Sequence, residues 1–104
     1  MTPSNVVFTK RANRDLDALY EWIVTDSGVP RADAVMLRID QILERIAYMP
    51  GMGRVRREFD ITPQSYAVWP WVIFYRTNPK GEGIQVLRIL DGRRHIPKNL
   101  APRR

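Results

Sequence analysis

The sequence predicts a small α+β fold in the order β-α-α-β-β-β, with a two-helix hairpin packed on one face of an antiparallel sheet. Two patterns predict it. Apolar residues follow helical spacing through residues 12–46, whereas β-branched and aromatic runs separated by turn residues fill residues 53–90. At 104 residues and 44% hydrophobic side chains, the chain can bury one modest core. Residues 1–104 are therefore expected to form a single domain.

The first half of the chain is expected to form one short strand and the two helices. Val6 to Phe8 is the strand candidate, and the Thr9 hydroxyl is placed to cap the helix that follows. Apolar residues then recur at spacings of three and four, and Gly28 is suited to end the helix. Pro30 fits the first turn of the second helix. The apolar side chains of both helices, including Trp22, are expected to lie in the core.

Four strand candidates fill the second half of the chain. They are GRVRREF (53–59), SYAVW (65–69), WVIFYR (71–76) and IQVLRIL (84–90). In the last of them, alternation places Val86, Arg88 and Leu90 on one side and Leu87 and Ile89 on the other. Both sides of the sheet are therefore expected to be largely apolar.

A sheet with two apolar sides raises the question of what covers the second one. A helix layer covers one side, so the other is expected to expose apolar residues and arginines, as binding surfaces do. The alternative is that the basic C-terminal tail, residues 91–104, folds back over it with Ile96 and Leu100 as anchors. The sequence does not fix the register between strands, so whether Arg76 and Arg88 are neighbours stays open.

Charge and composition limit the classes of function. Of the net charge of +6, residues 1–53 hold six Lys/Arg and seven Asp/Glu, whereas residues 54–104 hold eleven and four. This asymmetry favours an anionic partner, either nucleic acid or an acidic protein, over a surface that is merely soluble. The chain has no cysteine and a single histidine, so we expect no metal and no cofactor. It shows no signal-peptide pattern and no transmembrane run, so we expect a cytoplasmic protein without a membrane partner.

Three stretches and one helical pattern together resemble a known family. The stretches are GRVRREF, SYAVWPWVIFYR and IQVLRILDGRRHI, and the pattern A-x-x-D-L-x-x-L-Y-x-W-I spans residues 12–23. In this order and spacing they resemble the ParE branch of the RelE/ParE toxin superfamily, the small basic toxins of bacterial type II toxin–antitoxin modules. The likeness runs from Val6 to about Ile96. It departs at Gln64, where the family usually has arginine, and at Gly92–His95, where it often has Gly-Ala-Arg-Asp.

The resemblance implies the same β-α-α-β-β-β fold and a cognate antitoxin whose acidic C-terminal segment wraps the toxin. It also implies one of two activities. ParE-like members inhibit DNA gyrase, which we expect to be bound in its DNA-bound form, and they are associated with plasmid stabilisation. RelE-like members are ribosome-dependent endoribonucleases that cleave mRNA.

Proton-transfer groups distinguish these two activities. Cleaving RNA through its 2′-hydroxyl needs a base, an acid and cations for the phosphorane charge. RelE-like toxins tend to supply a tyrosine or histidine near the C-terminus, but no tyrosine follows Tyr75 here. The ribonuclease alternative therefore rests on four candidates: His95, Arg76, Arg88 and Glu58. We expect inhibitory protein binding without catalytic residues, with the ribosome and mRNA as the alternative partners.

Candidate contact residues for the target or the antitoxin lie on the second side of the sheet and in the tail. They are Arg54, Arg56, Phe74, Arg76, Val86, Arg88, Leu90, Arg93 and Arg94. For Arg54, Arg56 and Arg57 the alternative is a charged edge strand that prevents aggregation. A DNA-binding domain without toxin activity is a third hypothesis. It fits poorly because the two helices carry more acid than base, unlike a recognition helix.

Overall fold

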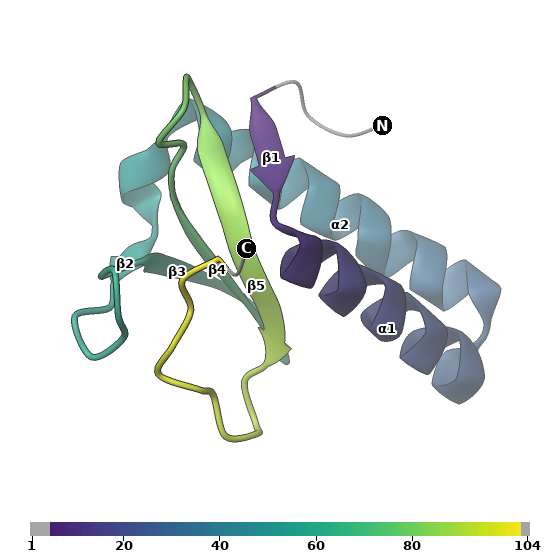
Figure 1. Cartoon of the computed structure of the whole chain (residues 1–104). Coiled ribbons are helices and arrows are strands. Elements are labelled where there is room, and N and C mark those ends of the chain that lie inside the picture. Colours follow the sequence, from purple (N-terminus) through teal and green to yellow (C-terminus); the bar gives the residue numbers. More distant parts are fainter. Residues whose placement is uncertain (1–4, 103–104) are drawn as a thin grey trace.

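The computed structural model describes residues 5–102 and consists of a helix layer, a central sheet and a layer of loops on the opposite side (Figure 1). The elements are β1 (Val6–Phe8), α1 (Lys10–Ser27), α2 (Val29–Tyr48), the 3-10 helix η1 (Pro50–Met52), β2 (Arg54–Val55), β3 (Gln64–Val68), β4 (Trp71–Thr77) and β5 (Ile84–Asp91). This order confirms the predicted β-α-α-β-β-β arrangement, with the two-residue β2 as an additional edge strand. Helices α1 and α2 lie side by side on one face of the sheet, as Figure 1 shows.

The ends of α1 follow the predicted signals. The Thr9 hydroxyl accepts a hydrogen bond from the Ala12 backbone at 3.0 Å and donates one to the Leu87 carbonyl at 2.9 Å. The cap therefore also ties the start of α1 to β5. Gly28 ends the helix with φ of +89°, a conformation that costs glycine little. Pro30 lies in the first turn of α2, where its missing N–H is not needed.

The sheet has the order β1-β5-β4-β3-β2. Strands β2 to β5 are antiparallel, as expected, but β1 pairs with β5 in parallel, so the complete sheet is mixed. Arg76 pairs with Gln85 across β4 and β5, and Arg88 pairs with Phe74, which settles the open question: Arg76 and Arg88 are not direct neighbours.

A bulge in β5 breaks the alternation predicted for that strand. Phe74 pairs with Arg88 and Tyr75 with Val86, so Leu87 is an extra residue without a partner in β4. As a result Val86 and Ile89 both pack in the core under the helices, whereas Leu87 packs on the other side of the sheet. The prediction that Val86 and Ile89 face opposite sides is therefore wrong.

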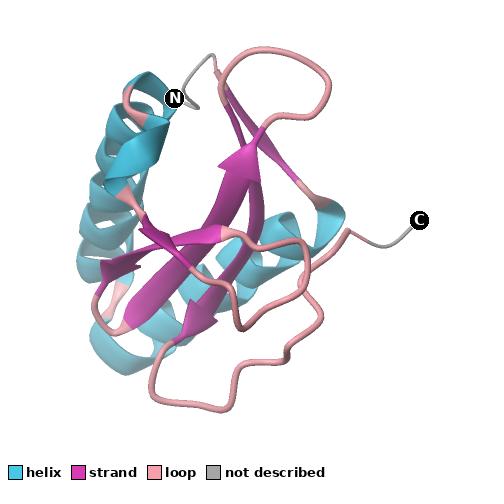
Figure 2. Cartoon of the chain, turned by 90° about the vertical axis from the view of Figure 1, so that its left-hand side faces the viewer, coloured by secondary structure: helices cyan, strands magenta, loops and turns pink. Residues whose placement is uncertain are grey.

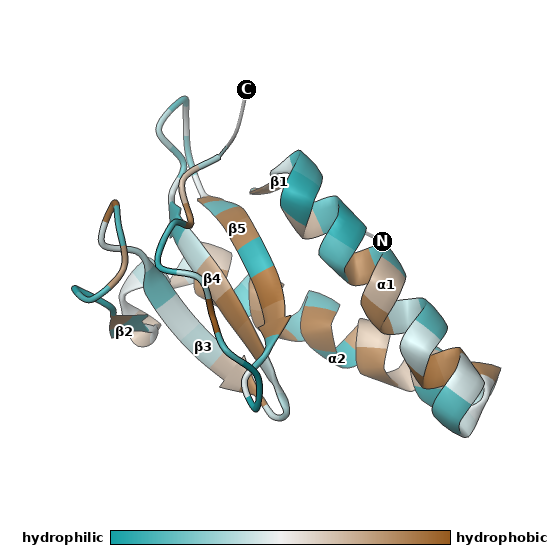
Figure 3. Cartoon of the chain, turned by 60° about the horizontal axis from the view of Figure 1, so that its bottom comes forward, coloured by the Kyte–Doolittle hydropathy of each residue, from teal (hydrophilic) through white to brown (hydrophobic). Residues whose placement is uncertain are grey.

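The side of the sheet away from the helices is covered by the chain itself. Phe59, Phe74, Leu87 and Leu100 form a second buried cluster there, with Val72, Leu90 and Ile96 packed against it. We call the segments that cover it, residues 56–63 and 92–102, the loop layer (Figure 2). Figure 3 shows hydrophobic residues along β4 and β5 beneath these loops. The expectation of a bare second side is wrong, and the alternative, a tail folded back on Ile96 and Leu100, is confirmed.

The predicted strand at 53–59 shortens to β2 because its second half joins the loop layer. The backbone turns after Val55, with Arg56 donating to the Pro63 carbonyl at 2.8 Å and Ile61 and Thr62 at positive φ. This turn places Phe59 edge-on to Phe74, with ring centroids 5.2 Å apart. Burial of an aromatic side chain therefore outweighs the strand tendency of this stretch.

Candidate functional site

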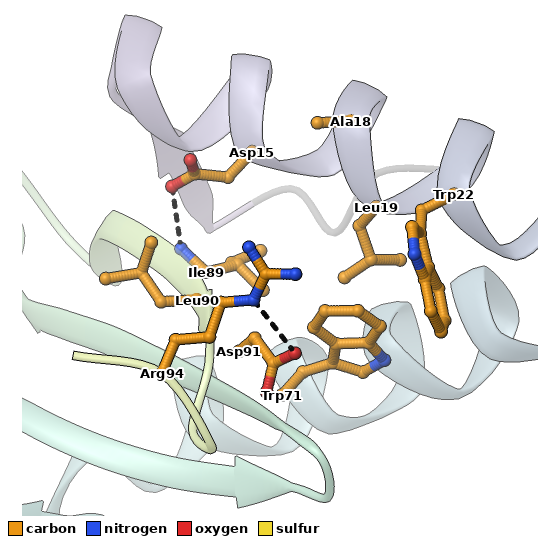
Figure 4. Close-up of a pocket in the computed structure, with 9 residues that line it drawn as sticks. All are labelled: Asp15, Ala18, Leu19, Trp22, Trp71, Ile89, Leu90, Asp91 and Arg94. Carbon is orange, nitrogen blue, oxygen red and sulfur yellow. Dashed lines mark hydrogen bonds and ion pairs between the residues drawn. The ribbon is translucent and has the colours of Figure 1, made fainter. Parts of the chain in front are cut away.

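The candidate site is a groove between α1 and the end of β5, with a cavity volume of about 210 Å³. Its lining residues are Asp15, Ala18, Leu19, Trp22, Trp71, Ile89, Leu90, Asp91 and Arg94 (Figure 4). The groove is open to solvent along its length, and its lining is mostly apolar. It lies along the edge of β5 that faces α1, where that edge has no neighbouring strand, since β1 pairs only with Ile84–Val86 before the chain turns into α1.

Two tryptophans form the apolar end of the groove. Trp22 of α1 meets Trp71 of β4 edge to face, with ring centroids 5.9 Å apart (Figure 4). Trp22 is 49% exposed, and Trp69 in the adjacent β3–β4 turn is 70% exposed. The expectation that Trp22 is a core residue is wrong, because it lies at the edge of the apolar stripe of α1. Exposed tryptophans beside a pocket are typical of protein-binding hot spots.

The opposite end of the groove is held by an ion pair. Arg88 Nε lies 2.7 Å from Asp15 Oδ2 and its Nη2 lies 3.0 Å from Oδ1, with both side chains 14% exposed. Asp15 also accepts from the Ile89 backbone N–H at 3.0 Å, one of the strand groups left unpaired at this edge. This carboxylate therefore fixes the distance between α1 and β5 and defines the width of the groove.

The rim carries positive charge beside Asp91, the last residue of β5. Arg93 donates twice to this carboxylate, at 3.0 and 2.8 Å, and Arg94 lies 3.9 Å from it. Hydrogen bonds from the Arg93 side chain and backbone lower the pKa of Asp91 to about 2. Arg94 remains 81% exposed at the mouth of the groove. An acidic group of a partner could therefore replace Asp91 as the partner of Arg94.

The residues predicted to contact a partner fall into two groups. Phe74 and Val86 are fully buried, Arg56 lies over the Phe59 and Phe74 rings, and Arg76 binds the Gln85 side chain at 2.7 Å. These side chains, with Arg88, are engaged within the chain. Leu90, Arg93 and Arg94 lie in or beside the groove, and Arg54 is exposed on β2. For this second group a role in binding stays a prediction.

Within the described residues, no hydrogen bond or ion pair joins the four ribonuclease candidates to one another. Arg88 is paired with Asp15 on the α1 side, and Glu58 pairs with Arg56 at 3.0 Å in the loop layer. The backbone N–H of Glu58 and the Arg56 side chain lower the pKa of Glu58, which makes it a weaker base than a free glutamate. His95 is exposed after β5, and across residues 5–102 no hydrogen bond or ion pair joins it to the other three.

The sequence departure at Gln64 has a structural explanation. Its side-chain amide donates to the carbonyls of Pro50 at 2.9 Å and Gly53 at 3.4 Å, so it holds the short η1 segment against the sheet.

Within residues 5–102 no group of three acidic, histidine or cysteine side chains could hold a metal ion. In the same part of the chain neither helix is apolar enough over a sufficient length to cross a membrane.

Comparisons with known proteins give concordant matches. The family model for the ParE toxin of the type II toxin-antitoxin system, parDE, matches residues 6–96. Toxin ParE3 of Caulobacter vibrioides is 34% identical over 95 residues, which cover 91% of this chain and 93% of that protein. A solved structure described as the chromosomal ParDE TA system from P. aeruginosa matches with a TM-score of 0.68 and 25% identity. That match covers 88% of this chain and 96% of the other.

Proposed function

Because the chain belongs to the ParE toxin family of type II toxin–antitoxin systems, we propose that it inhibits DNA gyrase by binding and that a cognate antitoxin neutralises it. The proposal of inhibition without catalysis is carried by the engagement of the candidate catalytic residues with other partners in the fold. Glu58 is tied to Arg56 and Arg88 to Asp15, and among the described residues no hydrogen bond or ion pair joins either of them to His95. An inhibitor that acts by binding needs no such groups.

The groove between α1 and β5 supports the proposed antitoxin contact. Its apolar lining and half-exposed Trp22 suit one large apolar side chain of an amphipathic segment. Arg94 at its mouth suits an acidic residue of the same segment. The P. aeruginosa relative is described as a ParDE system, which supports pairing with an antitoxin of the ParD kind. The binding surface proposed here is therefore the groove, in place of the sheet side that the loop layer covers.

The target is tested by expressing the chain without an antitoxin in a bacterium. Gyrase inhibition predicts filamentous cells and DNA-damage signalling while ribosome-bound messages stay intact, consistent with action in the cytoplasm. A His95→Ala substitution serves as the check on catalysis, because it removes the only histidine of the chain. If this variant stays toxic, the result supports inhibition by binding over catalysis. Cleaved messages, with toxicity lost in His95→Ala, would instead support the ribosome-dependent endoribonuclease.

A further inference from the structure

The loop layer differs in charge from the helix layer. On α1 and α2 the exposed charged residues balance: five are basic and five are acidic. The basic ones are Lys10, Arg14, Arg31, Arg38 and Arg45, and the acidic ones are Asp17, Glu21, Asp26, Asp33 and Glu44. On β2 and the loop layer the exposed basic residues are Arg54, Arg57, Arg93, Arg94 and Lys98, and the exposed acidic ones are Glu58 and Asp60. The positive field of the molecule is therefore concentrated on one side.

The two acidic residues of the loop layer are engaged internally. Glu58 pairs with Arg56, and Asp60 Oδ1 accepts from the Leu100 backbone N–H at 2.5 Å. The Asp60 backbone N–H also donates to the Lys98 carbonyl at 3.0 Å, which joins the two loop segments into one layer. Basic side chains from two segments far apart in sequence are thereby brought into the same layer, where the carboxylates of Glu58 and Asp60 are already occupied.

We propose that this surface binds the phosphate backbone of duplex DNA through Arg54, Arg57, Arg94 and Lys98. Exposed cations are typical of phosphate contacts, whereas protein-binding surfaces have an apolar centre. The apolar groove lies beside α1, and of these four cations Arg94 alone also lines it. The inference deepens the proposed function, on which it rests, because gyrase holds DNA and the toxin would then contact both components.

Salt dependence gives a quantitative signature for this contact. Each phosphate neutralised by a cation releases about 0.9 counterion from B-DNA, so four contacts predict a slope of about −3.6 in log K against log salt. The probe is a fluorescein-labelled duplex of about 20 base pairs, titrated with the full chain between 50 and 200 mM NaCl. Measurement of its anisotropy needs no gyrase, so this result is independent of whether gyrase is inhibited.

Matched variants test whether DNA binding depends on these particular cations or only on the net charge of the chain. The R54Q/R57Q variant removes one exposed cation from β2 and one from the loop layer, and R31Q/R38Q removes two exposed cations from α2. We expect the first variant to lower the slope to about −1.8 and the second to leave it near −3.6. Circular dichroism confirms that each variant is folded.

Three results would overturn the inference. One is no DNA binding at 50 mM NaCl up to about 100 μM protein, which is the weak end of non-specific affinity. Another is an equal loss of binding in both variants, which reduces the effect to net charge. The third is equally tight binding of a labelled poly-glutamate peptide, which assigns the surface to an acidic protein. If DNA binding holds while purified gyrase is unaffected, the proposed function fails and the DNA-binding surface stands.

Discussion

Arg88 of β5 and Asp15 of α1 form a two-point ion pair, with N···O distances of 2.7 and 3.0 Å, that connects the sheet to the helix layer across one end of the groove. Both side chains are only 14% exposed, so solvent screens the pair weakly. Asp15 also binds the Ile89 backbone N–H. Arg88 is therefore committed to holding the fold together, although its sequence position invited assignment as a contact or catalytic residue.

Replacing Asp15 with Asn should lower the free energy of unfolding by about 2–3 kcal/mol, because Arg88 is left partly buried without a countercharge. Urea denaturation measures the change. Asp17→Asn is the matched control, since Asp17 is exposed on the same helix and its substitution should leave stability unchanged. Equal stability of the two variants would show that the pair contributes no more than a surface contact.

Leu100→Ala should destabilise the chain by about 2–3 kcal/mol, because Leu100 is 1% exposed against the Phe59–Phe74 cluster. The control is Asn99→Ala at the neighbouring exposed position. Both are compared by urea denaturation, together with hydrogen exchange at the Leu87 amide. An unchanged unfolding midpoint for Leu100→Ala would mean that the tail does not cover the second side of the sheet.

Gly53→Ala should destabilise the fold by about 1–3 kcal/mol, because its Cβ would overlap the Tyr75 hydroxyl. That hydroxyl donates to the Pro50 carbonyl at 2.7 Å and accepts from the Gly53 N–H at 2.9 Å, so it has little freedom to move away. Gly51→Ala is the control, since a Cβ there meets nothing within 4 Å. Equal melting temperatures for the two variants would contradict the close approach of the Tyr75 hydroxyl to Gly53.

The pKa of Asp91 is lowered to about 2 by Arg93, so the ion pair should persist at acidic pH. Because the folded pKa lies below the unfolded value, the stability this pair contributes is complete above about pH 4 and is lost as pH falls towards 2. A ¹³C NMR titration of the side-chain carboxyl should give a midpoint near 2. A midpoint near the model-peptide value would show that Arg93 points away in solution.

Trp22→Ala should weaken binding of the antitoxin segment by about 2 kcal/mol or more while leaving the toxin folded, because Trp22 is half-exposed at the edge of the groove. Isothermal titration calorimetry with the cognate antitoxin measures the change in affinity. Leu37→Ala is the control, since Leu37 is 59% exposed on α2 and does not line the groove. If neither variant loses affinity for the antitoxin, the antitoxin contact does not lie in this groove.

The element order and the helix ends could be predicted from the sequence because they depend on local signals. Thr9 caps α1 and Gly28 ends it as expected, and the last three strands lie within one or two residues of their predicted bounds. These features need only apolar periodicity, a hydroxyl before a helix and a residue that tolerates positive φ.

The covered sheet side and the groove could not be predicted because they depend on tertiary contacts. The bulge at Leu87 changes which side chains of β5 share a side, and strict alternation cannot reveal it. Phe59 and Leu100 meet only after two distant loops fold together. One signal for the groove was present: Asp15, Ala18 and Trp22 recur at helical spacing beside the main apolar stripe of α1.

The central claim, gyrase inhibition by binding, is tested most directly by incubating the purified chain with purified gyrase, ATP and relaxed plasmid. The account predicts that supercoiling stops, that cleaved plasmid accumulates with gyrase attached, and that adding the antitoxin reverses the effect. His95→Ala should behave like the unaltered chain in this assay. Unimpaired supercoiling at a molar excess of toxin, together with cleavage of mRNA on added ribosomes, would contradict the account.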